Sequence, residues 1–342
     1  MAFGDDRLMQ FDKTGNCSVY FSIILVSYKH DDFFADALNT VINQNYDKSR
    51  MELIIVCKSF GKPRDIIKET QFDFEVKLVI DDGFSQGSKY NSALQIARHE
   101  WIALLDDDDM WKPDKLLVLS DLILNNDELI YIHNLKRSIN GQVHFSDIYF
   151  ETNEKKENRD CRNTNKMKNN PINCMHNGSS ITFKKQIVSK YKYQLSNMPG
   201  GIDFFLFALA KIYKGKLLCL DQELTYFRIQ QKNYEFSSTQ IIYNLTRQLN
   251  GYYIIDNIIQ NDSKLRAFLH KQIISNQMKL SVLGNLKYSR IEAIMILKRM
   301  FQLKENVDKE FLIIGFLFGI TLINGKFAKR IYELASTSQH FA

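Results

Sequence analysis

Four consecutive carboxylates at the end of an apolar stretch are the residues in this sequence best suited to chemistry. Residues 101–113 read WIALLDDDDMWKP, so Asp106–Asp109 directly follow a run of apolar side chains. Neighbouring like charges raise one another's pKa and are relieved by a cation. Carboxylate oxygens are the ligands that Mg²⁺ and Mn²⁺ prefer. The run therefore predicts a divalent-metal site that bridges to a nucleotide diphosphate. An acidic turn before the next helix is the structural alternative.

The segments around this run alternate between strand and helix patterns. Continuous apolar, β-branched runs predict buried strands at residues 19–28, 51–57, 75–80 and 100–105. Helical spacing separates them, at residues 31–44, 62–71 and 87–99. This rhythm predicts right-handed βαβ units and a parallel sheet, which binds ligands at the carboxyl ends of its strands. The aspartates lie at one such end, and Ser27–Tyr28 and Cys57–Lys58 lie at two others.

The pattern changes after a helix that we expect to begin near Pro113. Residues 129–150 predict a hairpin with its turn at Asn140–Gly141. The almost wholly polar residues 151–171 predict a mobile loop or lid. The later elements are expected as a strand running into a helix at 178–191, a helix at 200–215, strands at 216–220 and 224–229, and four helical segments at 238–260, 264–284, 288–303 and 308–335. We therefore expect a catalytic domain at 1–235 and a basic helical region at 236–342.

Charge and composition limit the class of protein. The 342 residues carry a formal net charge of +6, but Lys264 to Ala342 alone hold 13 Lys/Arg and 5 Asp/Glu. This basic region suits an anionic surface, with solvated helix faces as the alternative. The apolar run 311–323 is shorter than the ~18 residues that span a bilayer. We expect a cytoplasmic protein, peripheral on the cytoplasmic membrane face, that does not bind nucleic acid. The sequence predicts no oligomeric state.

The five cysteines and the amino terminus bear on the compartment. The cysteine count is odd and no pair has CxxC spacing, which argues against a disulfide framework and a zinc ribbon. The first residues, MAFGDDRLMQ, show no basic start and no apolar core of a signal peptide. Both observations favour a reducing cytosol.

Residues 91–116, NSALQIARHEWIALLDDDDMWKPDKL, resemble the core signature of family 2 glycosyltransferases with the GT-A fold. In that signature an Asn precedes a helix, and an apolar strand then runs into Asp-x-Asp-Asp, an aromatic residue and a Pro. The matching positions here are Asn91, Asp106, Asp108, Asp109, Trp111 and Pro113. The first strand and its exit, SIILVSYKHDD, resemble the family's opening strand. The resemblance continues through residues 176–185, 200–210 and 224–230, and so covers about residues 19–235.

The resemblance implies a fold and an activity. The fold would be an α/β GT-A domain, with a Rossmann-like, mostly parallel sheet flanked by helices, followed by a C-terminal helical region. The activity would be inverting and would need Mn²⁺ or Mg²⁺. A hexose-like sugar would move from a UDP- or GDP-sugar donor to a hydroxyl of a saccharide or lipid-linked acceptor, in glycan biosynthesis.

The resemblance also implies roles for the residues that react. Asp203 would be the general base that takes the proton of the acceptor hydroxyl, although a helix N-cap is its structural alternative. Asp108 would be the main metal ligand with Asp109 beside it. Gln230 stands where many relatives have a metal-site His, and its carbonyl can also bind a hard cation. Asp106 would hold the ribose or sugar of the donor.

The remaining candidates line the two substrates. We expect the donor to contact Ser27, Tyr28, Lys58, Asp82, Lys89, Asn91, Asp107 and Arg228. Among these, Lys89 and Arg228 would neutralise the diphosphate, and Asp107 falls at the variable place of the motif, where pointing to solvent is the alternative. His176 and Asn177 would face the acceptor, with a purely structural histidine as the alternative for His176.

Three departures from the family pattern keep other functions open. Cys57–Lys58 replace the usual Asp pair at the end of the second strand, and an Asp pair stands one strand later at Asp81–Asp82. Gln230 replaces the usual His, and Gly-Gly-Ile precedes Asp203 where a Glu-Asp pair is usual. A nucleotidyltransferase on a similar fold would leave Asp203 without a role. A non-catalytic, saccharide-binding relative would tolerate all three departures.

Overall fold

The structure is a computed structural model in which the chain divides into two compact units. One consists of Met1–Asn197 with Ile202–Gln230, and the other of Met198–Gly201 with Gln231–Ala342. We treat each unit separately. The structure describes residues 18–28, 32–83, 85–140, 143–145, 177–213, 215–229, 238–259, 263–302 and 309–337.

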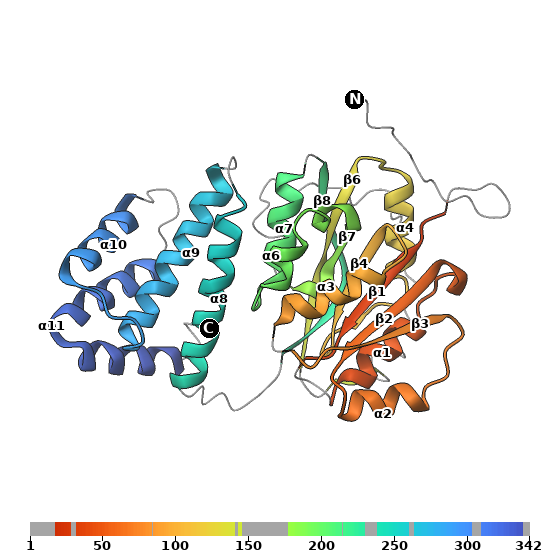
Figure 1. The fold of residues 1–342 in the computed structure, drawn as a ribbon, viewed down its shortest axis with the longest axis horizontal. Coiled ribbons are helices and arrows are strands. Elements are labelled where there is room, and N and C mark those ends of the chain that lie inside the picture. Colours follow the sequence, from red (N-terminus) through yellow and green to blue (C-terminus); the bar gives the residue numbers. More distant parts are fainter. Residues whose placement is uncertain are drawn as a thin grey trace. The chain divides into compact units, whose positions relative to one another are not determined.

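The first unit is built on an eight-stranded sheet in the order β3-β2-β1-β4-β7-β6-β8-β5 (Figure 1). The strands are β1 Phe21–Val26, β2 Met51–Cys57, β3 Glu75–Ile80, β4 Trp101–Asp106, β5 Met110–Trp111, β6 Leu129–Asn140, β7 Ile181–Lys184 and β8 Lys216–Ile229. Strands β1 to β4 pair in parallel, as expected. β7 then runs antiparallel to both β4 and β6, so the sheet as a whole is mixed.

Helices cover both faces of the parallel half. They are α1 Phe34–Ile42, α2 Lys62–Glu69, α3 Gln86–Ile96 and α4 Lys115–Leu124. Further along the chain, α6 Lys192–Ser196 packs on α3, and α7 Ile202–Ile212 packs on β6. Side chains of α1 and α4, such as Leu38 and Leu119, pack with Leu25 and Leu53 of one sheet face. α3 packs on β1 and β2. Burial on both faces explains the unbroken apolar runs of β1 and β2, since each buried aliphatic side chain contributes about 1.5–3 kcal/mol.

Two predicted elements differ from the structure. The two segments predicted as separate strands, 216–220 and 224–229, form one strand, β8, of 14 residues. The hairpin expected at 129–150 is wrong within the described residues, because 143–145 contain no strand. β6 instead pairs along its length with β8, from Leu129↔Lys216 to Asn140↔Ile229. The backbone groups that a return strand would use on that edge are therefore already bonded.

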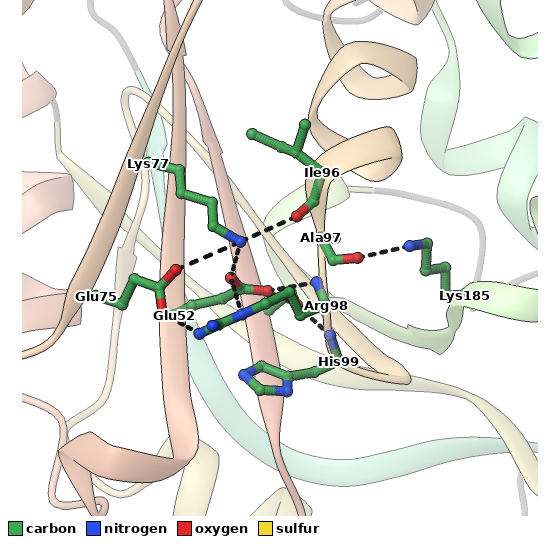
Figure 2. A network of polar contacts seen from close by, with 9 residues as sticks. Glu52, Glu75, Lys77, Ile96, Ala97, Arg98, His99 and Lys185 are labelled. Atoms are coloured by element: carbon green, nitrogen blue, oxygen red, sulfur yellow. Dashed lines mark hydrogen bonds and ion pairs between the residues drawn. The ribbon is translucent and has the colours of Figure 1, made fainter.

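A buried carboxylate links the first strands to the end of α3, at the edge of the sheet opposite the aspartates. Glu52 of β2 is 0% exposed and accepts hydrogen bonds from Ser22 Oγ at 2.5 Å, from the Arg98 backbone N at 2.6 Å and from Lys77 Nζ at 2.7 Å. Lys77 also donates to Ile96 O at 3.1 Å, as Figure 2 shows. The network joins β1, β2 and β3 to the residues that follow α3.

One cysteine departs from the sequence expectation. Cys219 of β8 is disulfide-bonded, a bond that the cysteine count and spacing did not predict. Cys57, at the end of β2, is free and buried.

The second unit consists of helices at the four places predicted for them. They are α8 Ser238–Asp256, α9 Ser263–Val282, α10 Arg290–Gln302 and α11 Lys309–Thr337. α9 packs against α8, α10 and α11. The predicted apolar run 311–323 lies within a longer span of α11, Phe311–Tyr332, which by length and composition alone, with a mean hydropathy of 1.8, could cross a membrane; a third of it is buried within the protein. The helix is interrupted at Asn324, whose φ of −149° and ψ of 90° are not helical.

Candidate active site

The four aspartates lie where the parallel sheet changes direction. β2 pairs with one edge of β1 and β4 pairs with the other, so the chain crosses in opposite directions from this point. Ligands of open α/β sheets bind outside the strand ends at such a switch point. The exits of the two strands are bonded to each other, because Tyr28 N donates to Asp107 Oδ2 at 2.7 Å. Asp107 is 3% exposed, so the alternative that it points to solvent is wrong.

Asp106 is held by hydrogen bonds to Ser179 and to Tyr90 of α3. Its backbone N donates to Ser179 Oγ at 3.0 Å, and Tyr90 OH donates to its Oδ1 at 2.9 Å. Burial raises the pKa of Asp106 well above its usual range, and the charges of Asp109 and Asp108 raise it further. A carboxylate in this setting gains from a nearby cation.

Asp109 sits deeper than its neighbours, with 2% of its surface exposed. Arg228 N donates to its Oδ1 at 3.1 Å. Burial and the charge of Asp108 raise the pKa of Asp109 to about 7, against the lowering effect of a hydrogen bond from Ser179. Asp109 therefore has one carboxylate oxygen bonded to the protein before any ligand is present.

A fully buried lysine lies beneath this loop. Lys115 Nζ donates to Ser179 O at 2.6 Å and to Thr225 Oγ1 at 3.2 Å, and it lies 4.3 Å from the centre of the Trp111 ring. Burial lowers the pKa of Lys115 well below its usual range, while the charge of Asp109 raises it. Trp111 Nε1 donates to the same carbonyl, Ser179 O, at 2.9 Å. The lysine and the tryptophan thus hold one turn against the aspartate loop.

That turn, the 3₁₀ helix η4 Gly178–Ser180, connects the aspartates with Asp203. Asn177 N donates to Asp203 Oδ2 at 3.1 Å. At the next residue, a Cβ on Gly178 would lie 3.0 Å from Asp106 Oδ2, so the carboxylate of Asp106 reaches against the glycine. Two adjacent residues therefore contact the carboxylates of Asp203 and Asp106. The predicted base and the predicted donor-binding aspartate thus lie beside the same turn.

Asp203 occupies the first turn of α7 and is half-buried. Its Oδ1 accepts a hydrogen bond from Phe204 N at 2.8 Å, so part of its role is that of a carboxylate at a helix N-terminus. Each carboxylate oxygen has two lone pairs, and the hydrogen bonds from Phe204 and Asn177 use one on each. The geometry is compatible with both the predicted base and the helix-terminal alternative.

The two cations expected to neutralise a diphosphate already have acidic partners. Arg228 NH2 lies 3.1 Å from Asp36 Oδ2, and its Nε donates to Asp108 O at 2.9 Å. Lys89 is 0% exposed; its Nζ lies 3.7 Å from Asp81 Oδ1 and donates to the carbonyl of Asp81. Both cations thus hold the loops around the site, and diphosphate binding by either stays a prediction.

The predicted donor residues at the ends of β2 and β3 form a second group. Ser59 N and Oγ donate to Asp82 Oδ1 at 2.8 and 3.1 Å, and these bonds lower the pKa of Asp82. Lys58 is exposed beside them. Ser27 is buried at the exit of β1, where its N donates to Val56 O at 2.8 Å, and Asn91 lies half-buried on α3.

Some predicted residues cannot be compared with the structure, and some structural residues were not predicted. Gln230 and His176 lie outside the described residues. Tyr90, Lys115 and Ser179, which bond to the aspartate loop or to the turn beside it, were not predicted from the sequence. Weak signals existed: Tyr90 precedes the predicted Asn91, and Lys115 is a single charge at the start of an apolar helix.

The carboxylates fit a metal ion that a substrate completes. The described residues contain no group of three or more His, Cys, Asp or Glu side chains able to hold a metal by themselves. Mg²⁺, however, is usually bound by one or two carboxylates together with substrate phosphates. Asp108 and Asp109 supply such hard oxygen donors. Beside them the pKa of Asp106 is raised first by burial and further by the charges of Asp109 and Asp108, a repulsion that a cation would relieve. Their chemistry therefore suits a divalent ion bound together with a diphosphate.

Comparison with known proteins agrees with this geometry. The profile described as Glycosyl transferase family 2 matches residues 22–190. A glycosyltransferase of Escherichia coli, UDP-Glc:alpha-D-GlcNAc-diphosphoundecaprenol beta-1,3-glucosyltransferase WfgD, is 31% identical over 114 residues, which are 32% of this chain and 44% of that protein. The matched segments span between 21% and 44% of the length of the curated relatives.

Two solved structures share the fold over most of both chains. S. aureus TarS, in complex with UDP-GlcNAc, has a TM-score of 0.54 at 13% identity, with 93% of this chain and 91% of that chain covered. The mannosyltransferase PcManGT of Pyrobaculum calidifontis, in complex with GDP-Man and Mn²⁺, has a TM-score of 0.52 at 14% identity, with 92% and 86% covered. The expected GT-A fold is confirmed. The chain belongs to glycosyl transferase family 2.

Proposed function

We propose that this protein is an inverting, metal-dependent glycosyltransferase. It moves a sugar from a UDP- or GDP-sugar to a hydroxyl of a saccharide or lipid-linked acceptor. The observation that carries the proposal is the Asn177–Gly178 turn, which contacts the carboxylates of both Asp203 and Asp106. One carboxylate for the acceptor and one for the donor thus lie on either side of a single turn.

Asp203 is the base in this proposal. The acceptor hydroxyl loses its proton to a carboxylate oxygen of Asp203 while the hydroxyl oxygen bonds to the anomeric carbon. The bond from that carbon to the diphosphate oxygen breaks on the opposite face, and its electron pair leaves with the nucleoside diphosphate. A single displacement of this kind inverts the anomeric configuration. The hydrogen bonds from Asn177 N and Phe204 N orient Asp203 for this transfer.

The aspartate loop binds the donor. Asp108, with Asp109 beside it, would hold Mn²⁺ or Mg²⁺, which would supply positive charge to the leaving diphosphate, and Asp106 would hold the ribose or sugar of the donor. Asp107 keeps the exits of β1 and β4 together through its bond from Tyr28 N. Asp82 and Lys58, at the neighbouring strand ends, would contact the nucleoside.

The relatives support this assignment by class. The names of the matched glycosyltransferases include a glucosyltransferase that acts on a diphosphoundecaprenol-linked sugar and a poly(ribitol-phosphate) glucosyltransferase. The structural neighbours are complexes with UDP, UDP-GlcNAc and GDP-Man. Nucleotide sugars of the UDP and GDP series are therefore the donors to screen first, by thermal shift with and without Mn²⁺.

Two variants test the assignment against a matched control. Asp203→Asn should lower transfer by about a thousandfold or more while leaving the donor-induced thermal shift intact, because only the base is lost. Asp108→Ala should abolish the part of the thermal shift that depends on Mn²⁺. Asp121→Asn, on the exposed face of α4, should change neither. Transfer by Asp203→Asn at the wild-type rate would show that the base lies elsewhere, and retention of configuration in the product would exclude the single displacement.

A further inference from the structure

The last two helices of the second unit leave large apolar side chains in solvent. Ile291 on α10 is 72% exposed, and on α11 Phe316 is 70% and Ile323 90% exposed. Single exposed apolar side chains are ordinary on protein surfaces. Several that gather on one pair of packed helices indicate a surface that binds something apolar.

These side chains follow the helical repeat. On α10, Ile291, Ile294 and Met295 lie at i, i+3 and i+4, opposite the buried Ala293 and Met300. On α11 the exposed positions Leu312, Phe316 and Ile323 lie at i, i+4 and i+11, which again is one face. Each helix therefore has two apolar faces: one packs inside the unit, and the other is exposed to solvent.

α10 and α11 contact each other through their buried faces. Met300 Sδ fills the space in which a side chain at Gly315 would lie, since a Cβ there would be 2.4 Å from the sulfur. The next residue on each helix is an exposed phenylalanine: Phe301, 65% exposed, and Phe316. Each helix therefore presents an aromatic side chain to solvent directly after its residue in this contact.

Basic side chains stand among the apolar ones. Lys298 lies one turn after Met295 on the exposed side of α10, with Arg299 beside it. On α11, Lys326 and Arg330 are exposed after Ile323. Apolar side chains interleaved with Lys and Arg are the pattern of helices that lie in the headgroup region of anionic membranes.

We propose that α10 and α11 form a membrane-binding surface, with the exposed apolar side chains inserted into the interface of an anionic bilayer and the basic side chains on its phosphates. This inference does not depend on the proposed transfer reaction. It names the residues for the membrane contact that the charge of the C-terminal region predicts.

Two other arrangements fit the structure less well. A membrane-crossing α11 would have to pass the non-helical Asn324 through the bilayer and strip Phe311 and Phe318 from the interior of the unit, where both are buried. A second copy of the chain docked on the same face would bring Lys298, Arg299 and their counterparts together, which like-charge repulsion disfavours.

Vesicle flotation of the full chain tests the surface. The protein should float with vesicles of phosphatidylcholine mixed with phosphatidylglycerol, bind far less to phosphatidylcholine alone, and be released by high salt. Phe316→Ser and Ile323→Ser should each weaken the partition coefficient about tenfold, because each removes an inserted apolar side chain. Lys298→Gln with Arg299→Gln should weaken it about tenfold or more, and only for anionic vesicles.

Matched controls come from the first unit. Phe60→Ser removes an aromatic side chain of similar exposure, 72%, and Lys190→Gln removes an exposed cation; both should float like the wild type. Circular dichroism confirms that each variant is folded. Wild-type flotation by Phe316→Ser and Ile323→Ser would overturn the proposal. Resistance of the bound protein to high salt would also overturn it, because that indicates a spanning helix. So would variants that change the oligomeric state in light scattering without changing flotation, because that indicates an interface between copies or with an acidic protein.

Discussion

Replacement of Glu52 by Ala should destabilise the first unit strongly and leave catalysis intact. Glu52 is a fully buried carboxylate surrounded by cations, which are also features of an active site. It lies at the amino ends of β1 and β2, however, whereas Asp106 lies at the carboxyl end of β4. The substitution therefore separates a carboxylate that stabilises the fold from those that we assign to chemistry.

The expected loss follows from the partners that Glu52 would leave behind. Ser22 Oγ and the Arg98 backbone N lose an ionised acceptor at 2.5 and 2.6 Å, and hydrogen bonds to charged groups contribute about 1.5–3 kcal/mol each. Ser22 Oγ still accepts a hydrogen bond from His99 N, but its own O–H loses its acceptor. Lys77 is 24% exposed and Arg98 55% exposed, so water replaces most of their interaction. We expect Glu52→Ala to cost about 3 kcal/mol, and Glu52→Gln, which keeps an acceptor, about 1–2 kcal/mol.

The intrinsic fluorescence of the protein isolates this unit. Both tryptophans, Trp101 and Trp111, belong to it, so urea unfolding followed by tryptophan fluorescence reports the first unit without the second. A loss of about 3 kcal/mol corresponds to a fall in Tm of about 6–12 °C. The control is Glu223→Ala, which removes the surface ion pair with Arg137 and should cost about 0.5 kcal/mol or less.

Two results would refute this reasoning. A loss of less than about 1 kcal/mol for Glu52→Ala would mean that water or neighbouring side chains satisfy the abandoned donors. A fall in kcat/KM of more than about tenfold, at a temperature where the variant is folded, would mean that the network acts on the site through α3.

Three further outcomes follow from the same contacts. Burial raises the pKa of Glu52, but hydrogen bonds from Lys77, Ser22 and Arg98 bring it below the ordinary value of 4.5. The stability that the ionised Glu52 contributes is therefore fully present above pH 4.5 and is lost as pH falls through the lower folded-state pKa, so the difference in stability between wild type and Glu52→Gln should shrink below pH 4.5 in urea titrations. Gly178→Ala would press a Cβ against Asp106 Oδ2 and should lower kcat/KM about tenfold with little change in Tm. Arg228→Gln should cost about 2–3 kcal/mol in urea unfolding, because it leaves Asp36 without its cation; a neutral result would mean that His144, 3.0 Å from the same oxygen of Asp36, suffices.

The sequence predicts the fold best where one physical rule dominates. β1, β2 and β4 are buried on both faces, so their apolar runs are unbroken and their positions were predicted within two residues. β8 was predicted as two strands because Asp221, Gln222 and Glu223 interrupt the apolar pattern. In the structure Asn134 pairs with Leu220 and the next residue, Leu135, pairs with Glu223. The register therefore shifts within β8, and the polar residues occupy a bulge in one continuous strand. A bulge depends on the partner strand, which a local pattern does not contain.

The candidate site was predictable in its carboxylates and not in their supports. The run of aspartates at a strand end is a local signal. The bond between Tyr28 N and Asp107 joins residues 79 positions apart, and the bonds of Trp111 and Lys115 to Ser179 O span 68 and 64 positions. A backbone group takes part in each of the three: the N–H of Tyr28 in the first and the carbonyl of Ser179 in the other two. Every residue has a backbone carbonyl and every residue except proline a backbone N–H, so no side-chain pattern predicts these bonds.

The bond from Asn177 N to Asp203 has a consequence for how the specificity of this protein can diverge. The residue that orients the proposed base does so with its main chain, so its side chain is free of that task. Asn177 has a φ of 79°, which Asn, Asp and Gly adopt most readily, and only proline would remove the donor. The side chain of Asn177 has a separate task, because its Oδ1 accepts a hydrogen bond from Ser179 N at 2.9 Å at the start of η4. An Asp at this position would keep both that acceptor and the main-chain donor to Asp203, whereas a Gly would keep only the donor. If the proposed acceptor site lies beside this turn, the exchange of Asn177 for Asp is the first change to try when a new acceptor is sought.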